Sequence, residues 1–281
     1  MSELVIRTMT RADLAQVIEW AAAEGWNPGQ HDLDPFLAAD SGGFLIGELD
    51  GEPVASISVV KYGTRFGFLG LYIVRPGFRG RGHGIAIWRA GMARMQGRTV
   101  GLDGVVAQQA NYARSGFVLA YSHFRHEGRG RGVPLADARL QPLATLNPGA
   151  LNTYDRQLFP EERAAFLAAW IRQPGTQALG HVEDGRLTGY GVIRPSRSGW
   201  RIGPLFADDP GSARRLLDGL LGSVPAEAPV FLDVPMVNAE AVAMVQALGM
   251  TPAFETARMY AGSDPQLPVE RIYAVTSLEL G

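Results

Sequence analysis

The sequence predicts a mixed α/β fold, with a mixed sheet, in which one unit occurs twice in tandem. Short apolar stretches rich in β-branched and aromatic residues alternate with amphipathic helical stretches along the 281 residues. The hairpin dipeptide Asp-Gly joins two such stretches at Asp50-Gly51 and again at Asp184-Gly185. The chain is also long enough to bury two hydrophobic cores of ordinary size.

Local patterns predict each element of the first half. Stretches with strand composition cover residues 4–7, 44–49, 54–60, 69–74 and 100–102. Thr10, followed three residues later by Asp13, has the form of a capping box and predicts a helix start. A second helix begins near His83, because apolar side chains then recur at spacings of three and four. A short helix over residues 106–115 ends at Gly116, which suits a C-terminal cap.

The second half repeats this order at an offset of 134 residues, the separation of the two Asp-Gly turns. At that offset Leu71 falls on Leu205 and Pro76 falls on Pro210. Order and spacing together predict an internal duplication.

A change in amino-acid composition marks the boundary between the two copies. The stretch between them is rich in Gly, Arg, Pro and Ala, which predicts a connector, and a helix is expected to begin at Pro160 with Glu161 and Glu162 in its first turn. We therefore expect a first domain, a connector and a second domain over residues 1–127, 128–149 and 150–281.

The most informative segment is Arg79-Gly80-Arg81-Gly82-His83-Gly84, between a strand and a helix. Glycines at such a join let backbone N–H groups turn toward a ligand, and the helix N-terminus adds partial positive charge that suits phosphate. Arg79 and Arg81 add charge-assisted donors. The corresponding segment of the repeat carries Asp208 and Asp209, so we expect only the first copy to hold an anionic cofactor.

Two other interpretations of this loop stay open. A glycine-rich surface turn with two solvated arginines needs no ligand. A dinucleotide site would place an acidic ribose ligand about twenty residues beyond the glycines, near Asp103. The glycines follow G-x-G-x-G rather than G-x-G-x-x-G, so dinucleotide binding is the second choice.

Composition and charge narrow the partners. The formal net charge is −2 and the pI is about 6.2, which gives no global basic field for nucleic acid or for an anionic membrane. The basic run at residues 123–131 is interpreted as a solvated connector. Without cysteine the chain has no disulfide and no thiolate metal site, and we expect no metal. With no signal-peptide or spanning pattern, we expect a cytoplasmic monomer or homodimer.

Two ordered motifs resemble the GCN5-related N-acetyltransferase (GNAT) family. The glycine loop fits that family's [RQ]-x-x-G-x-[GA] signature for the acetyl-CoA pyrophosphate, and Tyr112-Ala113-Arg114-Ser115-Gly116-Phe117 fits its Y-x-x-x-G-F signature. The resemblance covers residues 4–125 through motifs and the second unit through order and spacing. It implies an intact N-terminal and a degenerate C-terminal GNAT-like domain, and the end of the chain looks like a two-domain, YitH-like subgroup.

The resemblance implies that acetyl-CoA lies along the strand at residues 69–74. Its expected binding residues are Ile73, Val74, Arg79, Gly80, Arg81, Gly82, His83, Gly84 and Asn111. The N–H of Val74 would polarise the thioester carbonyl as charge develops on its oxygen. Tyr112, with an ordinary pKa near 10 against about 8.5 for a thiol, would protonate the departing thiolate.

The proton acceptor and the acceptor-binding residues are less constrained. Asp103, at the cofactor-facing end of its strand, and a water chain are alternative general bases, although an aspartate before a glycine is often a turn residue. Trp26, Asn27 and Asp32, in the loop after the first helix, offer an aromatic wall, an amide and a carboxylate for a cationic amine. A packed loop with a buried tryptophan is the alternative.

Two functions remain. The first is an acetyl-CoA-dependent N-acetyltransferase acting directly on the primary amine of a small molecule or peptide. The second is a non-catalytic CoA-binding or sensing module whose second copy contacts partners. Tyr112 beside an intact glycine loop favours catalysis.

Overall fold

The computed structural model describes residues 3–281, and across them thirteen strands join in one mixed sheet. The first six strands are β1 (Val5–Thr8), β2 (Phe44–Leu49), β3 (Glu52–Tyr62), β4 (Phe66–Val74), β5 (Thr99–Val105) and β6 (Val118–Arg129). The others are β7 (Leu140–Pro142), β8 (Gln177–Glu183), β9 (Arg186–Pro195), β10 (Trp200–Ala207), β11 (Pro229–Pro235), β12 (Thr251–Ala261) and β13 (Ile272–Ala274). The predicted tandem α/β architecture is confirmed.

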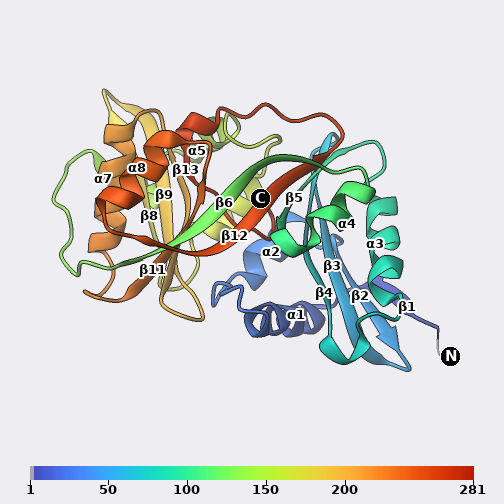
Figure 1. Cartoon of the computed structure of the whole chain (residues 1–281). Coiled ribbons are helices and arrows are strands. Elements are labelled where there is room, and N and C mark those ends of the chain that lie inside the picture. The colour runs from blue at the N-terminus through green and yellow to red at the C-terminus, as the bar shows by residue number, and fades with distance from the viewer. Residues whose placement is uncertain (1–2) are drawn as a thin grey trace.

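The two halves exchange a strand at the centre of the sheet. The spatial order is β1-β2-β3-β4-β5-β12-β6-β11-β10-β9-β8-β7, with β13 paired to β10. The late strand β12 therefore lies against β5 of the first half, and β6 lies against β11 of the second (Figure 1). The expected boundary between residues 127 and 128 falls within β6.

Helices cover both faces of this sheet. The first half contains α1 (Arg11–Ala23), α2 (Leu33–Ala39), α3 (His83–Arg94) and α4 (Gln109–Arg114), and the second contains α5 (Pro148–Asp155), α6 (Ala164–Trp170), α7 (Pro210–Gly222) and α8 (Ala239–Ala247). Buried residues of α1, α2, α5 and α6 share one core that belongs to both halves. Side chains of α3 form a second core with β3, and α7 and α8 form a third with β10 and β11.

Local signals fixed several of these elements. Thr10 caps α1 and exchanges hydrogen bonds with Asp13, which is the predicted capping box. Asp50 and Asp184 adopt positive φ angles of 50° and 49° in the two predicted hairpin turns. Hairpin turns of this kind need such angles, which Asp tolerates and Gly adopts freely.

The helix expected at Pro160 begins later, at Ala164. The residue before it, Arg163, turns its guanidinium inward to Asp155, with Nε and Nη2 donating to the two carboxylate oxygens at 2.9 and 2.8 Å. It also lies 3.9 Å from the ring centroid of Phe159. This buried pairing holds the preceding segment out of a helix, a tertiary effect that first-turn propensities do not report.

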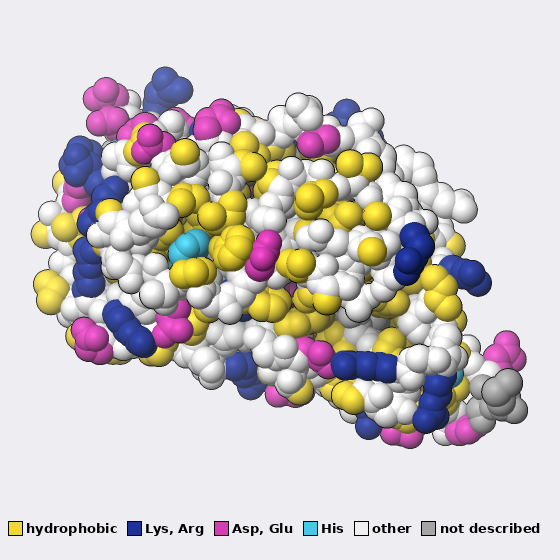
Figure 2. Space-filling model, viewed as in Figure 1, with side chains coloured by type: hydrophobic (Ala, Val, Ile, Leu, Met, Phe, Trp, Pro, Cys, Tyr) yellow, Lys and Arg dark blue, Asp and Glu magenta, His cyan; other side chains and the backbone are white. Residues whose placement is uncertain are grey.

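Surface charge is unevenly spread on the face shown in Figure 2, where charged side chains gather mostly toward the two ends. Hydrophobic side chains lie across the middle, over the crossing strands β6 and β12. Among the residues that the structure describes, no helix is long and apolar enough to cross a membrane.

Candidate active site

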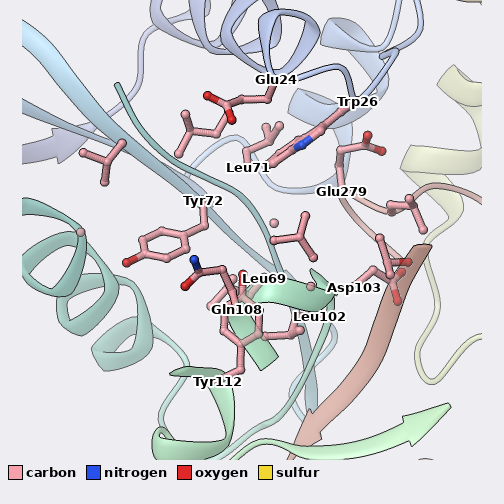
Figure 3. Close-up of a pocket in the computed structure, with 18 of the residues that line it drawn as sticks. Glu24, Trp26, Leu69, Leu71, Tyr72, Leu102, Asp103, Gln108, Tyr112 and Glu279 are labelled. Carbon is pink, nitrogen blue, oxygen red and sulfur yellow. The ribbon is translucent and has the colours of Figure 1, made fainter. Parts of the chain in front are cut away.

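The site is a fork between two strands of the first half. β4 and β5 pair in parallel only where residues 66–69 face residues 99–102, and beyond that point they separate. Just past the fork, Leu71 has a φ of 44° and the register of β4 against β3 shifts, which marks a β-bulge. A cavity of about 590 Å³ opens between the separated strands (Figure 3).

The backbone of β4 turns polar groups toward this cavity. Arg75 donates its N–H to the carbonyl of Val54 at 3.0 Å. Hydrogen-bonded and non-hydrogen-bonded pairs alternate along an antiparallel ladder, so the next pair, Val74 with Ala55, is non-hydrogen-bonded. The N–H and C=O of Val74 therefore face the fork, and Arg79 Nε does donate to that carbonyl at 2.7 Å.

The glycine loop forms an open helix N-terminus at one end of the cavity. Gly80 and Gly82 have φ angles of 75° and 87°, and Gly82 is the N-cap of α3 without any side-chain cap. Among described residues, then, no side chain takes the first N–H groups of α3, which are the groups that bind phosphate. A Cβ on Gly84 would lie 2.7 Å from the Tyr72 hydroxyl, so this close approach needs glycine.

The loop's cations are placed unequally. Arg79, Gly80, Gly82 and Gly84 line the cavity. Arg79 also forms an ion pair with Glu24 at the end of α1. Arg81 and His83 are not among the lining residues, and Arg81 lies over the ring of Phe78.

Tyr112 also lines the cavity, and its side chain is buried, with 7% of the residue exposed. Its ring stacks on the ring of Trp88 at a centroid distance of 5.6 Å. The same ring lies directly over Gly104, since a Cβ added to Gly104 would lie 2.2 Å from the Tyr112 ring. Burial raises the pKa of Tyr112 to about 12. The hydroxyl therefore stays protonated at neutral pH, as a proton donor must. Asn111 instead contacts Gln108 and Arg114 and is not a lining residue, whereas Gln108 is.

Asp103 lines the cavity but is already paired. Arg258 donates to both carboxylate oxygens at 2.7 Å, and His123 Nδ1 lies 3.1 Å from one of them. Burial alone would raise the pKa of Asp103, yet the cation and the histidine together hold it below its usual value. A carboxylate bound on both oxygens is a weak proton acceptor.

The three expected acceptor-binding residues separate in space. Trp26 lines the cavity, but Asn27 and Asp32 do not. Asn27 exchanges two hydrogen bonds with Ser198, and buried Asp32 accepts from Arg194 Nε and Nη2 at 2.8 and 3.1 Å. These contacts join the loop to the second half of the chain, a partner that local sequence could not reveal.

The second half instead supplies lining residues that sequence reasoning missed. They are Phe254, Thr256, Leu278 and Glu279, from β12 and from the C-terminal segment, residues 275–281. That segment crosses β4 so closely that a Cβ on Gly70 would lie 2.1 Å from the Glu279 carbonyl oxygen. A glycine inside a strand, which signals close backbone approach, was the one available hint.

The second copy has the same fork, but it is filled. β10 and β11 pair in parallel only where residues 200–202 face residues 230–232. Beyond this, β13 pairs with β10, and Val275 donates its N–H to the Asp233 carbonyl of β11 at 3.0 Å. At the start of α7, the carboxylate of Asp209 accepts from the N–H groups of Gly211 and Ser212. The protein itself thus occupies both the fork and the helix N-terminus.

Comparisons with known proteins agree with this duplicated arrangement. Residues 11–117 match the acetyltransferase (GNAT) family, and residues 151–274 match an acetyltransferase (GNAT) domain. The chain is 34% identical over 265 residues to a holothin acyltransferase of Pseudoalteromonas sp. (strain SANK 73390), which covers 94% of this chain and 90% of that protein.

Two solved structures share the whole architecture. A putative acetyltransferase from Pyrococcus horikoshii has a TM-score of 0.84 at 21% identity, covering 99% of this chain and 96% of the other. A tandem GNAT protein from the clavulanic acid biosynthesis pathway has a TM-score of 0.62 at 17% identity, covering 93% and 100%. At these identities the two structures show the fold alone.

Proposed function

Because this chain is an acyltransferase of the GNAT family, with two GNAT domains in tandem, we propose that it transfers an acetyl group directly from acetyl-CoA to the primary amine of a small molecule or peptide. The observation that carries the proposal is the open fork between β4 and β5. One cavity there joins an uncapped helix N-terminus, a free backbone N–H and a buried, protonated tyrosine.

The residues present fit the donor. The positive φ of Gly80 and Gly82 and the free N–H groups at the start of α3 suit a pyrophosphate, and Arg79 adds a cation. The Val74 N–H at the edge of β4 suits an amide carbonyl of a pantetheine arm, whereas the adjacent Ile73 pairs with Ser56 of β3. When bound, acetyl-CoA supplies the acetyl thioester.

The chain's own groups then divide the chemistry. The Val74 N–H donates to the thioester carbonyl oxygen, where negative charge develops during attack. Tyr112 gives its hydroxyl proton to the thiolate sulfur that leaves. The ion pairs of Asp103 disfavour it as the base and favour another acceptor, water or a second carboxylate of the cavity.

Thermal stability tests the donor. Acetyl-CoA should raise the melting temperature and NAD should not, since a ligand stabilises the state that binds it. A shift with NAD alone would favour the dinucleotide interpretation.

Turnover tests the reaction. Release of free CoA should depend on an added amine, measured across small-molecule and peptide amines with holothin, the compound for which the relative is named, as one member. Acetyl-CoA binding without turnover of any amine would support the CoA-sensing module instead.

A further inference from the structure

Two residues that line the active-site cavity each carry a buried polar atom without a hydrogen-bond partner among the described residues. The atoms are Glu279 Oε2 and Thr256 Oγ1, in side chains that are 3% exposed. Buried polar atoms are nearly always paired, so each unpaired one needs an explanation. Two such atoms, both on cavity-lining residues of the second half, point to a ligand that completes them.

Glu279 stands at the apex of the fork. Its backbone packs on Gly70, one residue before the bulge at Leu71 and one residue after the last pairing of β4 with β5. The glycine loop follows the other end of β4. Figure 3 shows Glu279 beside Trp26, across the cavity from Tyr72. A donor whose phosphates sit at the loop would direct its thioester toward this apex.

The carboxylate of Glu279 is less committed than that of Asp103. Arg201 Nη1 is 3.4 Å from Glu279 Oε1, but the same guanidinium makes its short contact, 2.6 Å, with Asp233. Arg125 also binds Asp233, so two arginines face two carboxylates and the charges balance. Glu279 therefore keeps one oxygen free, whereas both oxygens of Asp103 are occupied.

The walls around these two atoms are apolar. Trp26, Phe254, Leu278 and Leu71 line the same cavity. Aromatic walls favour a flat apolar body, and the few polar groups of such a site fix its orientation.

Resting on the acetyltransferase function proposed above, we propose that Glu279 binds the acceptor's amine and takes its proton. Thr256 holds a second polar group of an acceptor that carries a primary amine on a flat apolar body. The acceptor's ammonium gives one proton to Glu279 Oε2, and the neutral nitrogen then forms a bond with the acetyl carbon and loses its second proton to water. The carbon–sulfur bond breaks, and Tyr112 protonates the thiolate. The second copy thus supplies the acceptor site of the first.

Glu279→Gln is the direct test, with 2-phenylethylamine as the probe. We expect kcat/KM for the amine to fall by about 100-fold or more, since positioned general bases contribute at least that much. Calorimetric binding of 2-phenylethylamine to the CoA-bound protein should weaken, while the Kd for acetyl-CoA should stay unchanged. Glu270→Gln, an exposed glutamate on the same terminal stretch, is the matched control and should change none of these.

Further variants separate the parts of the site. Glu279→Asp keeps the charge that faces Arg201 but withdraws the carboxylate by one methylene, and should lose kcat while retaining acetyl-CoA binding. Thr256→Val should raise KM for the amine several-fold with little change in kcat. The wild type should prefer 2-phenylethylamine over n-butylamine, and Trp26→Ala should reduce that preference.

The outcomes of these experiments separate the role of Glu279 from the acetyltransferase function on which it rests. If the wild type acetylates no amine, the acetyltransferase proposal fails. If the wild type turns over 2-phenylethylamine and Glu279→Gln does so with the same kcat, KM and amine Kd, the acetyltransferase survives and the role of Glu279 is refuted. A wild-type preference for n-butylamine would refute the apolar body.

Discussion

The two halves of the molecule contain the same strand fork, but one is open and the other is filled. In the first half, β4 and β5 separate around a cavity of about 590 Å³. In the second, β10 and β11 separate around β13 and the residue after it. Both forks persist, so the divergence of the strands belongs to the repeated unit itself. What differs is whether the exposed backbone groups are left for a ligand or satisfied by the chain.

The forks also share a buried ion pair. Cross-strand partners Arg258 and Asp103 join β12 to β5, and Arg125 and Asp233 join β6 to β11 in the same way. Because the filled fork keeps this pair, an Arg–Asp contact at that position does not require catalysis. It anchors the exchanged strands instead.

The largest effect should come from breaking one of these pairs. Arg258→Met leaves Asp103 buried with only His123, and we expect the unfolding free energy in urea to fall by about 3–5 kcal/mol. Arg125→Met should cost less, because Arg201 still lies 2.6 Å from Asp233. If Arg125→Met loses as much stability as Arg258→Met, or more, then Arg201 does not compensate for the loss of Arg125.

Gly82→Asp attacks the open fork directly. The substitution places a carboxylate at the N-cap of α3, against the proposed pyrophosphate. The Kd for acetyl-CoA, measured by calorimetry, should rise by about 100-fold or more, which is about 2.7 kcal/mol. The circular dichroism spectrum should match the wild type. If acetyl-CoA binds the variant as tightly as the wild type, the pyrophosphate does not lie at the N-terminus of α3.

Tyr112→Phe removes one hydroxyl from the cavity. We expect kcat to fall by roughly 100-fold with little change in KM for acetyl-CoA. Since burial raises the pKa of Tyr112 to about 12, the acid stays protonated and the wild-type rate should show no descending limb below about pH 10. Tyr72→Phe, which deletes the other tyrosine hydroxyl at this cavity, is the control. A rise in KM alone would make Tyr112 a binding residue.

The smallest effect is expected in the filled fork. Asp209→Ala removes the cap of α7 and should lower stability by about 1 kcal/mol in urea unfolding. Acetyl-CoA stoichiometry should remain one per chain, because β13 still occupies the fork after the acidic cap is gone. A second bound acetyl-CoA would mean that the carboxylate, not β13, excludes the ligand.

The sequence predicted the features that depend on residues close together in the chain. The hairpin turns at Asp50 and Asp184, the cap at Thr10 and the glycine loop each depend on neighbours within a few residues. The order of elements then revealed the duplication and the family. Tyr112 lines the cavity, as its motif implied, and Trp26 lines it from the loop after the first helix, where acceptor contacts were expected.

The remaining features depend on contacts between distant parts of the chain. Nothing near Asp103 shows that Arg258, 155 residues later, occupies its carboxylate. Asn27 meets Ser198, and Glu279 reaches Gly70, only because the halves share one sheet. Periodicity reports which face of a strand is buried, but it does not report which strand lies beside it.

The exchange of β6 and β12 constrains how this molecule could have evolved after its duplication. Each copy completes its sheet with a strand of the other, since β5 is paired by β12 and β11 by β6. A gene that dropped the second copy would leave β5 with a bare hydrogen-bonding edge, which invites aggregation. The first copy therefore still needs β12 of the second to complete its sheet, although the helix N-terminus of the second copy is capped by Asp209.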